Sequence, residues 1–260
     1  MLKTLLRTKS AWIEIFLVFG LSFFASSADA YNSFFAFPNW NYIITLGAGQ
    51  IRSTDTGNTA YFPASQPGAR FYSYTPKQTL QRALLIDGFI GIQGMILPNW
   101  FLQLGLDYAQ PGTSFKAEGY VSQGIAGGAT QTSTYKYSVL GRQLLFEGKF
   151  LATIGDVLHP YLLAGLGGSF NKAYNYRTNV NTPFTRVYLN RTQTSFSYTV
   201  GAGIDLDVTN RMRIGIGYRF ADLGAFKLGQ ASVNHANVSG TLSQSHLYTN
   251  ALLGQVTVVL

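Results

Sequence analysis

The feature that most constrains this chain is an alternation of apolar with small or polar residues at a period of two. That period belongs to β-strands whose two faces meet different surroundings. The alternation is cleanest in Ser195–Asp207, where every second residue from Phe196 to Leu206 is apolar or aromatic. The residues between them are Gly, Ser, Thr or Asp. Together with this stretch, the pattern predicts seven further strands: Asn41–Arg52, Arg82–Leu97, Trp100–Tyr108, Tyr137–Ala152, Pro160–Tyr174, Arg211–Phe220 and Leu247–Leu260.

Short and long connections alternate strictly between these eight stretches. The short ones are Leu97–Trp100, Gly155–His159 and Val208–Asn210. The long ones run roughly over Ser53–Gln81, Gly112–Thr134, Asn175–Gln193 and Ala221–His246. An antiparallel up-and-down barrel with these connections has three tight turns and both termini on one side, and four long loops on the other. Outer-membrane barrels share this arrangement.

The composition indicates which strand face points outward. Charged residues make up 12% of the chain, about half the ~25% usual for soluble domains. A soluble barrel or sandwich, the alternative with the apolar face inside, would carry many more Lys and Glu. Gly, Ser and Thr on the polar face suit the cramped interior of an eight-stranded barrel. The sequence therefore predicts an all-β fold, an eight-stranded antiparallel up-and-down transmembrane β-barrel.

The first thirty residues predict an export signal. Lys3, Arg7 and Lys9 precede the apolar run Ile15–Ala25, and Ala28-Asp29-Ala30 matches a small-residue cleavage pattern. The run is about half the ~20 residues of a spanning helix, which favours a cleaved signal over a single anchor. We expect a signal peptide at 1–30, a barrel domain at 31–260, and a location in the cell outer membrane.

With the polar faces inward, the charged residues of the strands would share the barrel interior. An eight-stranded interior is just wide enough for side chains to fill it, so the sequence predicts a plugged lumen. Buried charges need partners, and we expect Arg213 and Arg219 to pair with Asp205, Asp207 or Glu147. The predicted lumen network comprises Asp87, Asp107, Glu147, Lys149, Asp205, Asp207, Arg211, Arg213 and Arg219.

The long connections are the predicted binding regions, because rigid scaffolds usually present their binding residues on loops. The third connection is basic, with no acid between Asn171 and Gln193. Cations near an anionic surface contribute roughly 1 kcal/mol each, so a basic collar could hold the phosphates of lipopolysaccharide. The candidate contacts to lipopolysaccharide or another partner are Arg70, Lys77, Lys172, Arg177, Arg186 and Arg191.

The sequence shows few residue patterns that would indicate a catalytic, metal or cofactor site. The chain has no Cys and three scattered His, so the sequence predicts neither a metal site nor a cofactor. Ser243, Ser245 and His246 lie where a surface lipid hydrolase could place a nucleophile and a base, which leaves a lipid-modifying enzyme as a remote alternative. Gly124–Gly128 lacks the Lys-Ser/Thr of a phosphate loop and is interpreted as a flexible loop. The basic residues are dispersed, so we expect no nucleic-acid partner.

Three motifs in order carry a family resemblance. His159–Gly167 resembles the fifth strand of opacity-type, OmpA-transmembrane-like outer-membrane barrels, Thr199–Asp205 resembles the sixth, and Gly217–Gly224 resembles the end of the seventh. The resemblance implies an integral outer-membrane protein assembled by the barrel assembly machinery. Members have roles in envelope integrity, adhesion and immune exposure. Such barrels usually finish on an aromatic residue, whereas this chain ends Val258-Val259-Leu260.

These observations together predict a non-enzymatic outer-membrane barrel with a plugged lumen. It would act in envelope structure, or in adhesion to an unidentified host or surface ligand, through its four external loops. The alternative is a narrow channel for ions or small hydrophobic molecules.

Overall fold

The computed structural model describes residues 40–53, 57–64, 70–125, 128–155, 157–179 and 185–260. The predicted signal segment 1–30 and residues 31–39 of the predicted barrel domain lie outside this range. Within the described residues, no helix is long and apolar enough to span a membrane. The described residues form β-strands joined by turns and irregular segments.

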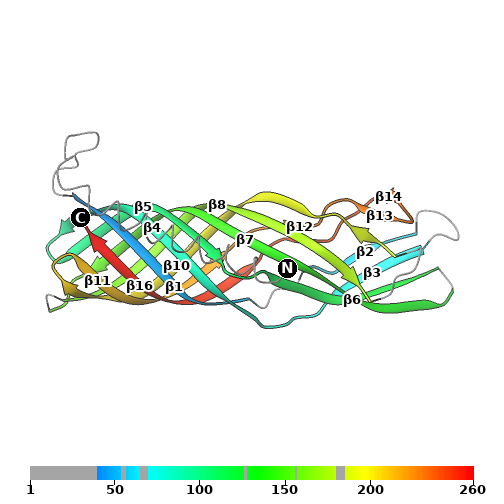
Figure 1. The fold of residues 1–260 in the computed structure, drawn as a ribbon, viewed down its shortest axis with the longest axis horizontal. Coiled ribbons are helices and arrows are strands. Elements are labelled where there is room, and N and C mark those ends of the chain that lie inside the picture. Colours follow the sequence, from blue (N-terminus) through cyan, green and yellow to red (C-terminus); the bar gives the residue numbers. More distant parts are fainter. Residues whose placement is uncertain (1–39, 54–56, 65–69, 126–127, 156, 180–184) are drawn as a thin grey trace, which may run out of the picture. The chain divides into compact units, whose positions relative to one another are not determined.

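Eight strands close a barrel (Figure 1). Each strand pairs antiparallel with the next, from β1 through β4, β5, β7, β8, β10 and β11 to β16, and β16 pairs back with β1. Closure leaves the barrel without an unpaired edge. The prediction of an eight-stranded up-and-down barrel is confirmed. The barrel strands are β1 (Trp40–Ser53), β4 (Gln81–Leu97), β5 (Trp100–Pro111), β7 (Thr130–Ala152), β8 (Leu158–Thr178), β10 (Arg191–Thr209), β11 (Met212–Asp222) and β16 (Tyr248–Val259).

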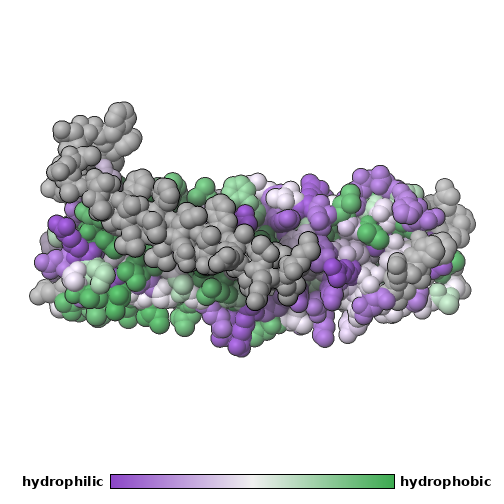
Figure 2. Space-filling model, in the orientation of Figure 1, coloured by the Kyte–Doolittle hydropathy of each residue, from purple (hydrophilic) through white to green (hydrophobic). Residues whose placement is uncertain are grey.

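The two faces of the barrel wall differ as the alternation predicts. Large apolar side chains point outward, with Leu46 65% and Phe196 67% exposed. Polar side chains point inward, with Gln103 1% and Asp205 0% exposed. On the face shown in Figure 2, hydrophobic residues gather over the barrel strands, and hydrophilic residues gather over the part that carries β2, β3, β6, β13 and β14 in Figure 1. Polar and charged side chains are buried in the interior while the exterior of the wall is apolar, an arrangement that a soluble protein does not show.

The long connections contain strands of their own, so the interpretation of these connections as loops is wrong. Strand β6 pairs with the first part of β7, and β3 pairs with β6, which continues the barrel wall as an outer sheet. Gly124 lies in β6 opposite Thr130, which contradicts the flexible-loop interpretation there; residues 126–127 are outside the described range. The additional strands are β2 (Ala60–Phe62), β3 (Arg70–Pro76), β6 (Phe115–Ile125), β9 (Val187–Tyr188), β12 (Phe226–Lys227), β13 (Ala231–Val233), β14 (Ala236–Val238) and β15 (Ser243–Gln244).

A hydrophobic core fills the barrel and the outer sheet on the side of the long connections. After β11 the chain turns inward, so that β12 lies against β8 and β10. Leu223, Phe226 and Leu228 are each at most 2% exposed and pack with side chains of the surrounding strands. The last connection therefore closes this end of the interior with apolar side chains.

Tyrosines from four strands form the core of the outer sheet. Tyr74 of β3 packs edge-to-face on Tyr135 of β7 and on Tyr188 of β9, with ring centroids 5.3 and 6.1 Å apart. Tyr176 of β8 lies 4.8 Å from Tyr188. Burial raises the pKa of Tyr135 to about 12 and raises the pKa values of Tyr74 and Tyr188 further. These hydroxyls stay neutral at ordinary pH, as a packed aromatic core requires.

Candidate functional site

Arg219 occupies the centre of the barrel interior. It stands on β11, where the alternation directs it inward, and its side chain is 4% exposed. Its guanidinium contacts Asp107 directly, lies 3.2 Å from Asp87 and lies 3.5 Å from Glu147. The Arg219 Nε donates to the Thr199 hydroxyl at 2.9 Å. One arginine thus holds three carboxylates that come from β4, β5 and β7.

A second pair lies beside this cluster. Lys149 donates to Asp205 at 2.6 Å, and both side chains are at most 5% exposed. The Lys149 ammonium also lies 3.7 Å from the centre of the Tyr161 ring, a cation–π contact. Gln255 donates to both the Asp205 carboxylate and the Tyr161 hydroxyl, at 2.5 and 3.2 Å. The pair is therefore enclosed by hydrogen bonds and an aromatic face.

A third group lies toward the short turns. Arg213 donates from Nε to Asp207 at 2.7 Å and from Nη1 to the Gln93 amide oxygen at 2.7 Å. His159 contacts the other Asp207 oxygen through Nε2 at 2.9 Å. Because the Asp207 side chain is 27% exposed, this group marks the boundary between the buried ion pairs and the solvent on the turn side.

Glycines provide the space for these side chains. A Cβ at Gly217 would stand 2.1 Å from the Tyr161 hydroxyl, and one at Gly47 would stand 1.8 Å from an Asp87 oxygen. The cavity that remains around Arg219 has a volume of about 20 Å³, which is space for about one water. At this level the described side chains occupy most of the interior.

All eight residues Asp87, Asp107, Glu147, Lys149, Asp205, Asp207, Arg213 and Arg219 make ion pairs within the interior. The pairs Arg213–Asp207 and Arg219–Glu147 are among those that the sequence predicts. The contacts of Arg219 with Asp87 and Asp107, and the pair Lys149–Asp205, were missed because they depend on how the strands are staggered. The placement of Arg211 in the interior is wrong, since Arg211 is exposed at the turn before β11.

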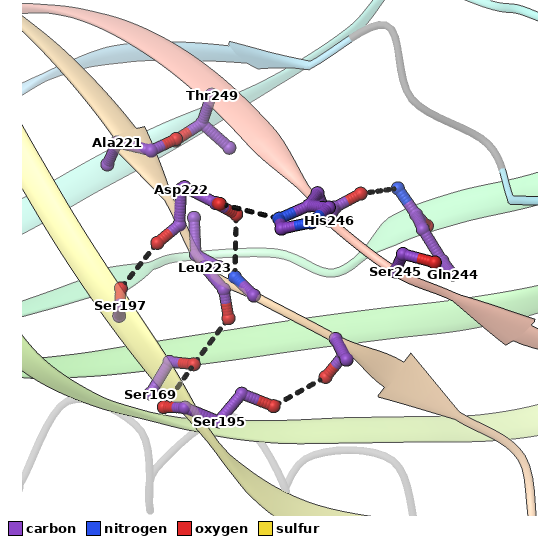
Figure 3. A network of polar contacts seen from close by, with 12 residues as sticks. Ser169, Ser195, Ser197, Ala221, Asp222, Leu223, Gln244, Ser245, His246 and Thr249 are labelled. Atoms are coloured by element: carbon purple, nitrogen blue, oxygen red, sulfur yellow. Dashed lines mark hydrogen bonds and ion pairs between the residues drawn. The ribbon is translucent and has the colours of Figure 1, made fainter.

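At the end of the interior near the long connections, a network of hydrogen bonds joins the segment after β11 to the barrel wall (Figure 3). Ser197 donates to the Asp222 carbonyl at 2.6 Å, Ser195 donates to the Ala225 carbonyl at 2.9 Å, and Ser169 donates to the Leu223 carbonyl. Asp222 is the last residue of β11, and Leu223 and Ala225 lie beyond it, where the serines of β8 and β10 satisfy their carbonyls. The small polar residues on the inner face therefore anchor the segment that closes the interior.

Asp222 and His246 lie at the two ends of the same connection, where β11 ends and shortly before β16 begins. His246 Nδ1 is 2.7 Å from Asp222 Oδ2, and Asp222 Oδ1 accepts from the Gly224 amide at 2.8 Å. The His246 ring stacks on Tyr248 with centroids 5.5 Å apart. Ser245 instead accepts a hydrogen bond from Asn58 at 2.8 Å. In the described part of the chain no serine hydroxyl is hydrogen-bonded to the His246 ring, so Ser243, Ser245 and His246 form no nucleophile–base pair there.

The described acids lie almost entirely on the inner face of the wall, whereas most of the described cations are exposed. Among the described residues, every acid except Glu118 faces the interior or is buried. Exposed cations lie on the outer surface and on the turns: Arg52, Lys77, Arg82, Lys116, Lys136, Arg142, Lys172, Arg177, Arg191 and Arg211. Five of these, Lys116, Lys136, Arg142, Lys172 and Arg177, stand on the adjacent strands β6, β7 and β8.

The predicted lipopolysaccharide contacts divide into exposed and enclosed residues. Lys77, Lys172, Arg177 and Arg191 are exposed, and Arg70 is half-buried. Arg186 is 5% exposed, with its guanidinium 4.2 Å from the centre of the Phe62 ring. The assignment of Arg186 to an external binding surface is therefore wrong, because the tyrosine-rich core of the outer sheet encloses it. The predicted contacts do not include Arg142, Lys116 and Lys136. These cations lie within strands, where a charged residue on the outward face interrupts the apolar alternation.

No group of His, Cys, Asp and Glu in the described residues has the arrangement of a metal site. The interior carboxylates are instead engaged by Arg219, Lys149 and Arg213.

No protein-family model and no curated protein sequence matches the chain. Solved structures that it is similar to include Neisserial surface protein A, with 13% identity, a TM-score of 0.41 and coverage of 86% of this chain and 98% of that one. The outer membrane protein OprG from Pseudomonas aeruginosa has 12% identity, a TM-score of 0.44 and coverage of 83% and 95%. The attachment invasion locus protein Ail of Yersinia pestis has 12% identity, a TM-score of 0.36 and coverage of 85% and 99%. At these scores the barrel assignment depends on the strand pairings of the chain itself.

Proposed function

We propose that the chain is an integral outer-membrane protein with a sealed lumen, acting in envelope structure or surface interaction through the part formed by its long connections. The observation that carries this proposal is the inverted barrel wall. Leu46, Phe196 and their neighbours would each expose an apolar side chain to water, whereas a bilayer solvates them. A closed barrel satisfies all backbone groups internally, which the hydrocarbon region demands.

The sealed interior favours a structural or surface role over transport. The ion-paired layer around Arg219 leaves about 20 Å³ of space, and the apolar layer around Leu223 and Phe226 closes the other end. A solute crossing the barrel would have to break both layers. Interaction through the outer sheet needs neither layer to move.

The outer surface favours an anionic lipid neighbour. Arg142 stands on the outward face of β7 directly opposite Phe170 of β8, with Leu144 next along the same face. Lys172 lies diagonally across, opposite Leu140. A cation at the margin of an apolar belt is stabilised by anionic head groups, and lipopolysaccharide phosphates are the anions that the outer leaflet offers.

A planar-bilayer measurement tests the sealed lumen. The purified mature chain, inserted into a bilayer, should show no steady conductance steps, because both interior layers remain packed. A porin of known diameter in the same lipid serves as the positive control. Reproducible openings of one size would contradict the sealed interior and favour the channel alternative.

Cysteine labelling of intact cells tests the location and orientation. The chain has no Cys, so a single introduced thiol reports one position. Gln131→Cys, exposed in the outer sheet, should react with a membrane-impermeant maleimide on intact cells. Asn210→Cys, exposed in a short turn, should react only after the outer membrane is permeabilised. Equal labelling of both positions in intact cells would contradict the proposed location.

A further inference from the structure

We infer that a hollow between β6, β7 and β8 binds a phosphorylated core sugar of the outer-leaflet glycolipid. This inference rests on the proposed location in the outer membrane. The hollow has a volume of about 170 Å³ and is lined by Lys116, Lys136, Tyr137, Ser138, Asn175 and Arg177. Its lining contains three cations and no acid. Since a water needs ~10–15 Å³, there is room for a phosphate group and part of the sugar that carries it.

The strand register brings these cations together. Lys136 of β7 stands directly opposite Arg177 of β8, and Lys116 of β6 stands opposite Ser138, two residues along from Lys136. Like charges directly opposite on one face destabilise a sheet. Neither Lys116 nor Lys136 makes an ion pair with a described residue, although Glu118 stands opposite Lys136 on the other side. A bound anion would relieve this repulsion.

A β-bulge sets the direction of Arg177. The pairing of β7 with β8 shifts by one residue between Lys136 and Ser138, and Asn175 has a φ of 60° at this point. The extra residue reverses the alternation. Tyr176 consequently joins the buried tyrosine cluster, and Arg177 points outward. Its Nε donates to the Asn175 side chain at 3.1 Å, which fixes the guanidinium beside the bulge.

The distance of the hollow from the outward apolar side chains of the barrel wall indicates which phosphates of the glycolipid can reach it. Lys136 lies six residues beyond Arg142 along β7, which at ~3.3 Å per residue is about 20 Å of strand. With a strand tilt of ~35–45°, this places the hollow on the order of 15 Å outward from the edge of the belt. Phosphates attached to the lipid anchor lie at the edge itself, near Arg142 and Lys172. Phosphates on the sugars beyond it reach the height of Lys136 and Arg177.

The test measures binding of rough lipopolysaccharide by the mature chain refolded in detergent micelles. Lys136→Gln/Arg177→Gln removes two cations of the hollow. Arg52→Gln/Arg82→Gln is the matched control, because it removes a second directly opposed cation pair from β1 and β4. At roughly 1 kcal/mol per cation, the first variant should bind core-phosphorylated lipopolysaccharide about 30-fold more weakly. The control should change the affinity less than about 3-fold.

The source of the phosphate is distinguished by two further ligands. Lipopolysaccharide without core phosphates, and lipid A alone, should each bind the wild type and the Lys136→Gln/Arg177→Gln variant equally. If the Lys136→Gln/Arg177→Gln variant bound lipid A alone more weakly than the wild type does, the hollow would bind the anchor phosphates and the inference would be wrong. Equal losses of affinity in the two double variants would also contradict the inference. Lys136→Gln alone, at an exposed position, should weaken binding about 5-fold if the double variant folds poorly. Insertion of the wild type into lipid vesicles is measured separately, so failure to insert would refute the proposed function rather than the site.

Discussion

Replacing Ile216 by Arg should destabilise the barrel by ~2–4 kcal/mol in lipid vesicles. Ile216 is 56% exposed on the outward face of β11, opposite Ile204 of β10 and Gly254 of β16, in the middle of the strand. The proposed bilayer surrounds this position with hydrocarbon, where a guanidinium loses its hydration without gaining a partner. The free energy of unfolding, measured by denaturant titration of the vesicle-inserted chain, provides the comparison.

Val208→Arg is the control for this prediction. Val208 is also exposed, at 48%, but it lies at the end of β10 beside the turn. Near the interface an arginine costs only ~0–1 kcal/mol. Equal destabilisation by the two substitutions, or none by either, would show that the apolar face does not meet lipid.

Arg219→Met should cost ~3–5 kcal/mol, because it removes one partner of a buried ionic cluster. Methionine fills a similar volume, so packing is largely preserved while Asp87, Asp107 and Glu147 lose their shared cation. Three carboxylates around a cavity of about 20 Å³, too small for more than about one water, would repel each other and lack compensation. The measurement is again the free energy of unfolding in vesicles, at neutral pH.

Rescue separates charge from packing in this variant. Adding Asp107→Asn to Arg219→Met removes one of the carboxylates left without a cation and should recover part of the lost stability. Asp107→Asn alone should be destabilising, since it weakens the contact of Arg219 in the wild type. If the double variant were no more stable than Arg219→Met, the cluster would not act as an electrostatic unit.

The sequence predicts the barrel wall well because each strand is specified locally. A period of two, maintained over ten or more residues, determines both the strand and its outward face, as Phe196 and Asp205 illustrate. The tight turns are equally local, and Asn99 adopts the left-handed φ of 65° between β4 and β5. The predicted strand ends are less accurate, since β7 begins at Thr130 and β8 continues to Thr178.

The ion pairs could not be predicted in full because they depend on contacts across the barrel. Arg219 on β11 meets Asp107 on β5, a strand that is not its neighbour in the wall. Such pairs follow from the stagger of all eight strands, which no single stretch of sequence encodes. The bulge at Asn175 is a second feature that the alternation does not encode, because it reverses which residues of β8 face outward. The enclosure of Arg186 follows from the packing of the short strands β2 and β3 of the outer sheet and of β9, which pairs with β13.

Strands β7 and β8 pass from the barrel into the outer sheet without a break in their pairing, apart from the bulge at Asn175. Evolution can therefore exchange side chains on the outer surface freely, but it cannot readily change the number of residues in these strands. One residue inserted between Tyr137 and Val139 would turn Tyr135 and Tyr137 toward solvent and Lys136 toward the core. Sequence change in this part should therefore proceed by substitution, with length variation confined to the hairpin tips.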